Sequence, residues 1–278
     1  MKKYETLIRE LNQIRFKKNI KVPSRHLTQQ FVDTCSEILF PVNIDQHKDN
    51  LQTSKFIKAE YILRSLIYSI SETECPEGNQ ICNNFFEKFP EIASSLMEDA
   101  QTIYDFDPAA RSVDEVIAGY PGFFSIMVYR LSHVLYNFDI PLIPRLMSEY
   151  AHSKTGIEIS PGAKIGKSFF IDHGTGIVIG ETAIIYDNVK IYQGVTLGAM
   201  QVDKSLAQTK RHPTIENNTI IYSNSTILGG DTVIGHDSIV GGNVFLTKSI
   251  PPNSIVYQQS EVKIRNQDKK SSPIDFQI

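Results

Sequence analysis

The segment "IEISPGAKIGKSFFIDHGTGIVIGETAIIYDNVKIYQGVTLGA", residues 157–199, indicates the fold because compact apolar residues recur in it at a fixed interval. Stepping by six residues from Ile159, every position as far as Val195 is small or branched and apolar. The series resumes in a new register at Ile215. The full set is Ile159, Ile165, Ile171, Ile177, Ala183, Val189 and Val195, then Ile215, Ile221, Ile227, Val233, Ile239 and Phe245. This period is typical of a parallel β-helix built from hexapeptides.

Each hexapeptide of such a β-helix forms one short strand and one turn, and three hexapeptides complete a coil. Residues eighteen positions apart then stack at the strand spacing of about 4.8 Å. We therefore expect the periodic apolar side chains to fill the interior of a prism.

The break in the series predicts an extruded loop. Val195 and Ile215 are twenty residues apart, and the segment 200–210 between them is polar and has no apolar period. We expect this segment to bulge out of the coils. It can serve as a binding lid on a rigid scaffold, or it can be a tolerated surface insertion.

The first half of the chain has a different pattern. In "YILRSLIYSI" and "FFSIMVYRLSHVLYNF" apolar residues recur every three or four positions, which indicates helices. The prediction is an α+β chain with an α-helical oligomerisation domain at 1–150, a β-helix domain at 151–257 and a flexible tail at 258–278. An apolar stripe in the helical part marks helix packing and subunit contact: Tyr61, Leu63, Leu66 and Ile67.

Composition narrows the function classes. The formal net charge is -3, which gives no long-range attraction to nucleic acid or to an anionic membrane. No apolar run reaches the roughly 20 residues of a membrane span. The three cysteines are Cys35, Cys75 and Cys82, without zinc-ribbon or CxxC spacing. We expect a soluble cytoplasmic protein with reduced cysteines.

Several motifs together resemble one family. "DHGTGIVIGETA", "GVTLGA", the extruded loop, "RHPTI" and "ILGGDTVIG" follow one another here as in the serine O-acetyltransferases of the hexapeptide-repeat class. The resemblance covers about residues 105–257, and it includes "DFDPAA" and "GYPGFFSIMVYRLSHVL" before the coils. It implies a left-handed β-helix, trimers with active sites between neighbouring subunits, and hexamers joined through the helical domains.

The resemblance implies that His173 is the general base. Acetylation of serine requires removal of the hydroxyl proton, and an imidazole that titrates near neutrality suits this task. The position of Glu158 matches the carboxylate partner of that base, where the family commonly has Asp, and a carboxylate fixes the tautomer of such a histidine. Without the motif, a packed repeat histidine is the ordinary interpretation of His173.

The remaining site residues suit a small zwitterion. By resemblance, Asp107 and Asp172 bind the ammonium group of L-serine, Arg211 binds its carboxylate, and His212 hydrogen-bonds or polarises the substrate. For Asp107 a second interpretation is equally open, since Asp-Pro commonly opens a helix. Arg211 and His212 can also be a solvated loop end.

Acetyl-CoA is the expected co-substrate, with no metal. Because the cysteines lie outside the repeat and no serine has a nucleophile-elbow context, we expect direct transfer in a ternary complex. The positions aligned with the family's CoA contacts are Ala199, Ser223 and Gly241, with Lys248 as a possible phosphate partner. Two departures bear on these contacts. Ala199 replaces the second Gly of "TLGG", and "VYQQSEVKIRNQ" replaces the "GVPAR" tail.

The resemblance also implies partners. L-cysteine is a feedback inhibitor in the family because it resembles serine. Many members end in an isoleucine that enters the active site of cysteine synthase, and Ile278 matches it. A disordered end is an equally good interpretation of the tail.

Other function classes stay open. Hexapeptide prisms also form carbonic anhydrases with a zinc ion held by three histidines, and His173, His212 and His236 lie in the repeat region. They lack the close H-x4-H pair of that class. An acetyltransferase with a sugar or another amine as acceptor is a nearer alternative, and a non-catalytic scaffold is the plainest one.

Overall fold

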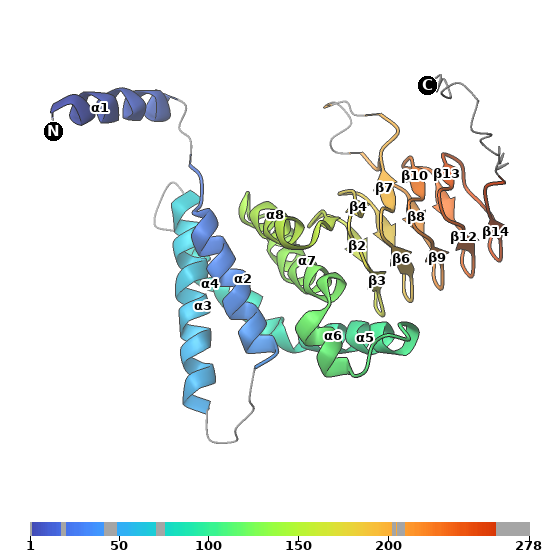
Figure 1. Ribbon diagram of the computed structural model, residues 1–278. Helices are drawn as coiled ribbons and strands as arrows, with labels where there is room; N and C mark the ends of the chain where they lie inside the picture. Colours follow the sequence, from blue (N-terminus) through green and yellow to red (C-terminus); the bar gives the residue numbers. More distant parts are fainter. Residues whose placement is uncertain are drawn as a thin grey trace, which may run out of the picture.

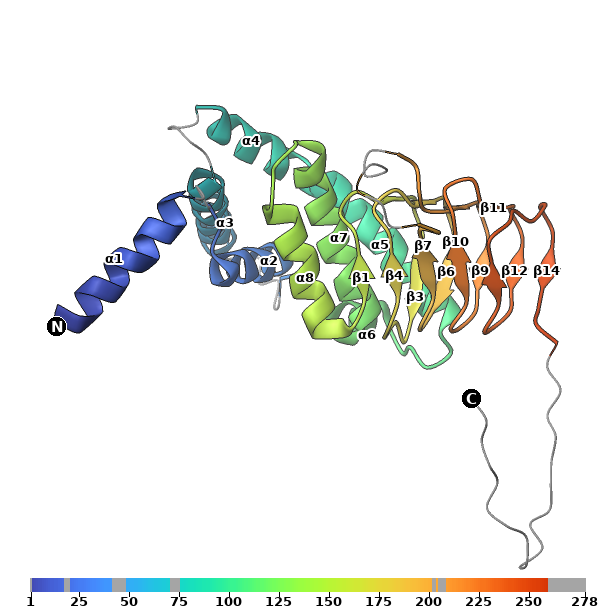
Figure 2. The same ribbon diagram turned by 90° about the horizontal axis from the view of Figure 1, so that it is seen from above.

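The computed structural model describes residues 2–17, 21–41, 49–70, 76–201, 204 and 209–259. Helices make up the first part of this described chain and short strands the second (Figure 1). The helices are α1 (Lys2–Lys17), α2 (Arg25–Leu39), α3 (Asp49–Ile70), α4 (Pro76–Glu87), α5 (Phe89–Phe106), α6 (Val113–Gly119), α7 (Pro121–Asn137) and α8 (Ile143–Thr155). Figure 2 shows α1 lying apart from the other helices.

Local sequence signals place several helix ends. Ser24 caps α2, where its side chain accepts a hydrogen bond from the backbone N–H of Leu27 at 3.3 Å. Gly156 ends α8 in a left-handed conformation, with φ of 72°, a C-terminal position that favours glycine. The β-helix begins directly after this glycine, so α8 leads straight into the first coil.

Three parallel sheets form the sides of the β-helix, and consecutive strands pass from one sheet to the next. Sheet A contains β1 (Glu158–Ile159), β4 (Val178–Ile179), β7 (Thr196–Gly198), β10 (Thr226–Leu228) and β13 (Phe245–Leu246). Sheet B contains β2 (Lys164–Ile165), β5 (Ile184–Ile185), β8 (Thr214–Ile215) and β11 (Val233–Ile234). Sheet C contains β3 (Phe170–Asp172), β6 (Lys190–Tyr192), β9 (Ile220–Ile221), β12 (Ile239–Val240) and β14 (Ile255–Val256). The predicted fold class is confirmed.

The length of a coil differs from the expected eighteen residues at defined places. Val178 pairs with Thr196 at the regular spacing, whereas Glu158 pairs with Val178, twenty residues further on. The two additional residues lie at the corner that contains His173. Thr196 pairs with Thr226 at a distance of thirty residues, which reflects the predicted extruded loop between β7 and β8.

Up to Ile227 the predicted interior residues are buried, except Ile165, which is partly buried; in the last coil the prediction is wrong. Ile234 and Val240 are buried there, whereas Phe245 is 65% exposed. Thr214 pairs with Val233, nineteen residues further on, instead of the regular eighteen. The residues that point into the interior therefore lie one position later in the sequence than the period of six predicts. Val233 and Ile239, the two predicted neighbours, are only partly buried.

The helical part packs on the first coils through α5 and α7. Tyr129 of α7 donates a hydrogen bond from its hydroxyl to the carbonyl oxygen of Ala163 at 2.7 Å. In the apolar stripe of α3, Leu63, Leu66 and Ile67 are buried, while Tyr61 is 72% exposed. No helix in the described residues is long and apolar enough to span a membrane. The predicted contact residue Ile278 lies outside the described residues.

Candidate active site

His173 stands at the corner where sheet C passes into sheet A. Its backbone is left-handed, with φ of 57°, and the next residue, Gly174, also has positive φ. A side chain at Gly174 would overlap Ile157, so this turn requires glycine. The His173 side chain is 72% exposed, and its Nε2 lies 3.7 Å from Oδ2 of Asp172. The corner therefore presents an accessible imidazole beside a carboxylate.

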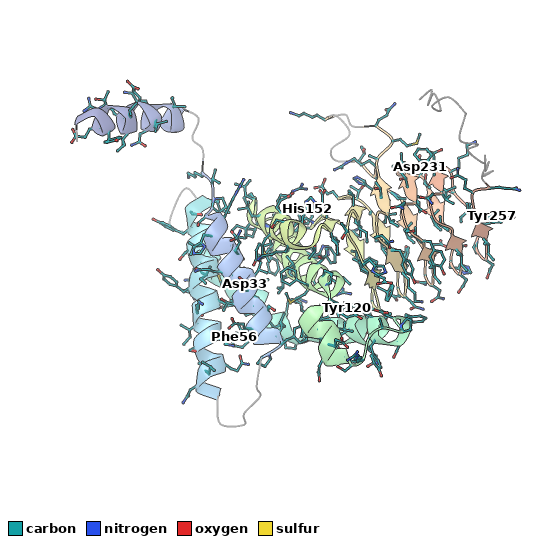
Figure 3. All side chains as sticks on the ribbon, viewed as in Figure 1. Asp33, Phe56, Tyr120, His152, Asp231 and Tyr257 are labelled. Carbon is teal, nitrogen blue, oxygen red and sulfur yellow. The ribbon has the colours of Figure 1, made fainter. Side chains whose placement is uncertain are left out.

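Asp107 lies near this corner and does not open a helix. It is the C-terminal cap residue of α5, so the helix-opening interpretation is wrong. Its Oδ1 accepts a hydrogen bond from the backbone N–H of Ala109 at 2.8 Å. Its Oδ2 accepts one from the hydroxyl of Tyr120 at 2.7 Å, and Tyr120 stands between α6 and α7 (Figure 3).

The charges of Asp107 and Asp172 act on the same tyrosines. The hydrogen bond to Asp107 is the main cause that raises the pKa of Tyr120 to about 12, and the charge of Asp172 contributes. Burial raises the pKa of Tyr192, and both carboxylates contribute there as well. The structure thus brings the carboxylates of Asp107 and Asp172 into one acidic neighbourhood. An ammonium group binds favourably beside such carboxylates.

Arg211 and His212 lie at a different corner, where sheet A passes into sheet B. Arg211 forms an ion pair with Glu181, and the hydroxyl of Tyr136 donates to Oε1 of the same carboxylate at 3.3 Å. A pocket of about 450 Å³ opens here. It is lined by these residues, by Glu158 of β1 and by residues of the α7–α8 connection. The pocket contains both signs of charge, as the binding of a zwitterion requires.

His212 is only 8% exposed and is held by Thr182. The backbone N–H of Thr182 donates to Nδ1 of His212 at 3.0 Å. Burial is the main cause that lowers the pKa of His212 to about 4, and the positive charges of Arg211 and Lys210 act in the same direction. At neutral pH this imidazole is uncharged.

Glu158, the predicted partner of His173, faces another residue within the chain. Its Oε1 lies 3.3 Å from NH2 of Arg145, which also pairs with Glu149. Within the described residues, no hydrogen bond or ion pair joins Glu158 to His173. The pairing of the base with Glu158 therefore stays a prediction.

The four predicted CoA contacts fall on two corners. Ser223 and Gly241 follow β9 and β12, and the carbonyl of Ser223 accepts the N–H of Asn243 from the next coil at 2.9 Å. Ala199 and Lys248 follow β7 and β13 at the corner that carries Arg211. Within one chain, the four predicted CoA contacts therefore do not form a single surface patch.

The three histidines of the zinc alternative occupy three different corners, since His173 follows β3, His212 precedes β8 and His236 follows β11. Among the described residues, no group of three or more His, Cys, Asp or Glu side chains is placed to hold a metal ion.

Sequence reasoning missed Tyr120, Glu181 and Thr182. Glu181 and Thr182 belong to the "GETA" motif quoted above, so their place in that motif was the available signal. Tyr120 is thirteen residues from Asp107, and no local pattern indicates their contact.

Comparison with known proteins assigns the family. No family model matches the chain. The protein named "Serine acetyltransferase, plasmid" of Synechococcus elongatus is 46% identical over 275 residues, 90% of this chain and 85% of that protein. A serine acetyltransferase of Bacillus subtilis is 50% identical over 126 residues, which span 45% of this chain and 56% of that protein.

A solved structure agrees with this assignment. Serine acetyltransferase 1 of Entamoeba histolytica, in complex with L-cysteine, superposes with a TM-score of 0.75 at 35% identity. The superposition covers 86% of this chain and 88% of that one. The fold and the relatives together identify the protein as an acyltransferase with a left-handed β-helix. More specifically, the chain belongs to the serine acetyltransferase family.

Proposed function

We propose that this enzyme transfers the acetyl group of acetyl-CoA to the hydroxyl of L-serine, giving O-acetyl-L-serine and CoA, the first step of cysteine biosynthesis. The observation that carries the proposal is the exposed imidazole of His173 beside Asp172, in a chain that belongs to the serine acetyltransferase family. An accessible imidazole can receive a proton from a bound hydroxyl, which a packed repeat histidine cannot do.

The substrate is oriented by its two charged ends. Its ammonium group faces the acidic neighbourhood of Asp107 and Asp172, and its carboxylate meets the guanidinium of Arg211, which exchanges Glu181 for the substrate. His173 accepts the hydroxyl proton while the serine oxygen attacks the thioester carbonyl carbon. The carbon–sulfur bond then breaks, and the protonated imidazole returns its proton to the departing thiolate of CoA.

The assembly we propose is a trimer or a dimer of trimers. His173 stands at one corner of the prism, with Asp107 of the helical part near it, whereas Arg211 and His212 stand at another corner. One substrate that contacts both groups is best accommodated where a corner of one subunit meets the other corner of its neighbour. We also propose that L-cysteine binds in this site as an inhibitor. The proposal is supported by the resemblance of cysteine to serine and by the existence of a complex of the Entamoeba histolytica enzyme with L-cysteine.

The test is serine-dependent release of thiol from acetyl-CoA by the wild type and His173→Ala. We expect the variant to lose about a hundredfold or more of the rate, as loss of a general base predicts. His236→Ala is the matched control, since His236 is exposed at another corner and pairs with Asp237. Full activity in His173→Ala would remove His173 as the base. Release that requires another acceptor would overturn serine as the substrate.

A further inference from the structure

Thr182 makes an unusual set of contacts with the segment that carries His212. It lies between β4 and β5, thirty residues before His212. Its hydroxyl oxygen accepts the backbone N–H of Arg211 at 2.9 Å and that of His212 at 3.1 Å. The same oxygen lies 2.9 Å from Nδ1 of His212. Thr182 therefore holds both the backbone and the ring of His212.

These contacts determine where the imidazole proton resides. Nδ1 of His212 accepts the backbone N–H of Thr182, so Nδ1 carries a lone pair and no proton. The Thr182 hydroxyl uses both of its lone pairs for two backbone N–H groups, and its own proton is left to point at Nδ1. The neutral ring must then carry its proton on Nε2.

Several described groups around His212 oppose its protonation. A second ring proton would sit on Nδ1 and meet two donors, which removes both hydrogen bonds. Arg211 is adjacent, and the ammonium group of Lys210 donates to the carbonyl oxygen of His212. Among the described residues, the charge of Glu181 favours the protonated ring, and this carboxylate is paired with Arg211.

Gly180 is the second residue that positions the imidazole ring of His212. A side chain at this position would overlap Cδ2 and Nε2 of His212, so the ring packs directly on the glycine backbone. Thr182 on one side and Gly180 on the other leave the imidazole one orientation in the wall of the pocket.

We propose that Thr182 is the positioning residue that holds His212 as a neutral Nε2–H donor, so that His212 orients a substrate oxygen and takes no part in removing the hydroxyl proton. The acceptor is a negatively charged oxygen, either the amino-acid carboxylate or the oxyanion that develops on the thioester carbonyl. This role rests on the proposed function, and it separates the two histidines chemically: His173 accepts a proton and His212 donates a hydrogen bond.

The direct test measures the titration of His212 in the full-length protein without substrate. Hydrogen–deuterium exchange at the imidazole C2 position, read by mass spectrometry between about pH 3 and about pH 9, reports the midpoint of each histidine. In the wild type we expect the His212 midpoint about two pH units or more below an ordinary histidine near 6.5. A wild-type midpoint near the ordinary value would overturn the proposal, whatever the variants do.

The variants assign this effect to the hydroxyl of Thr182. Thr182→Val removes the hydroxyl with little change in volume, and Thr182→Ser retains it. We expect the His212 midpoint to rise in Thr182→Val, with a loss of about tenfold in serine-dependent kcat/KM, and both to return close to wild type in Thr182→Ser. An unchanged midpoint and rate in a folded Thr182→Val protein would contradict the proposal.

Failure of the proposed function gives a different result. If the wild type lacks serine-dependent activity but shows the low His212 midpoint, the donor state of His212 stands and only the assigned reaction falls.

Discussion

Arg130 and Asp99 form a two-point ion pair beneath the first coils of the β-helix. Nε of Arg130 lies 2.6 Å from Oδ2 of Asp99, and its NH2 lies 2.8 Å from Oδ1. The same carboxylate accepts the backbone N–H of Phe169 at 2.9 Å, and Arg130 also donates to the carbonyl of Gly166 at 3.0 Å. Since Asp99 is fully buried, this network joins α5, α7 and a corner of the prism.

Arg130→Met should therefore destabilise the protein strongly. It leaves the Asp99 carboxylate buried without its counter-charge, which costs about 3–5 kcal/mol of unfolding free energy. Lys88→Met is the control, because Lys88 and Glu91 form an exposed pair worth about 0.5 kcal/mol or less. Urea unfolding followed by circular dichroism measures both. Equal losses in the two variants would show that the buried network does not stabilise the packing of α5 and α7 on the β-helix.

Gly122→Ala should weaken the contact between α7 and β3. A Cβ at this position would lie 2.5 Å from the carbonyl oxygen of Ile171, so either the helix or the strand must move. We expect a loss of about 1–3 kcal/mol, typical of overpacking. Gly119→Ala is the matched control, since its Cβ would meet nothing within 4 Å. Thermal unfolding compares the two, and a Gly122→Ala protein as stable as the control would contradict this account.

Tyr120→Phe should impair use of serine. The change removes the hydroxyl that donates to Oδ2 of Asp107. Among the described residues, the carboxylate then keeps only the hydrogen bond from the backbone N–H of Ala109 to Oδ1. We expect serine kcat/KM to fall by roughly fivefold, corresponding to about 1 kcal/mol. Tyr186→Phe, at an exposed position, should retain wild-type rates. An unchanged serine kcat/KM in Tyr120→Phe would mean that Asp107 is oriented without the tyrosine.

Glu158→Gln tests the predicted partner of the base. If Glu158 stabilises the imidazolium of His173 in the assembled enzyme, its loss should lower kcat by about tenfold or more with little change in serine KM. Arg145→Gln breaks the recorded ion pair of Glu158 but keeps the carboxylate, so its kcat should stay near wild type. If Arg145→Gln is as slow as Glu158→Gln, the carboxylate acts through Arg145 instead.

Stability should fall at mildly acidic pH because of His212. Its pKa in the folded protein is lowered to about 4, below the ordinary value near 6.5. Between these two pH values the unfolded chain binds a proton at His212 and the folded chain does not. The free energy of unfolding is therefore undiminished by His212 above about pH 6.5, and it decreases as the pH falls toward about 4. Melting temperatures across this range should fall less steeply in His212→Gln. His26→Gln, at an exposed position on α2, should keep the wild-type slope.

The sequence predicted the β-helix because its repeat is a local property. Ile159, Ile171, Ile215, Ile221 and Ile227 point inward as the period predicts, since each hexapeptide must bury one compact residue. Ile177 is also buried, although two additional residues precede it, because it takes the other inward position, two residues before Ile179. A shift of two residues thus preserves the apolar pattern and is invisible in the sequence, whereas the shift of one residue in the last coil exposes Phe245.

The fold class, the extruded loop, the family and the charged residues of the motifs could all be predicted from the amino-acid sequence. Which residues contact one another could be seen only in the folded chain, where Tyr120 meets Asp107 and Thr182 meets His212. The structure also divided the candidate site between two corners of the prism. This difference arises because a repeat depends on residues that are neighbours along the chain. The orientation and protonation of a site residue depend on hydrogen bonds and charges from segments that come together only when the coils stack.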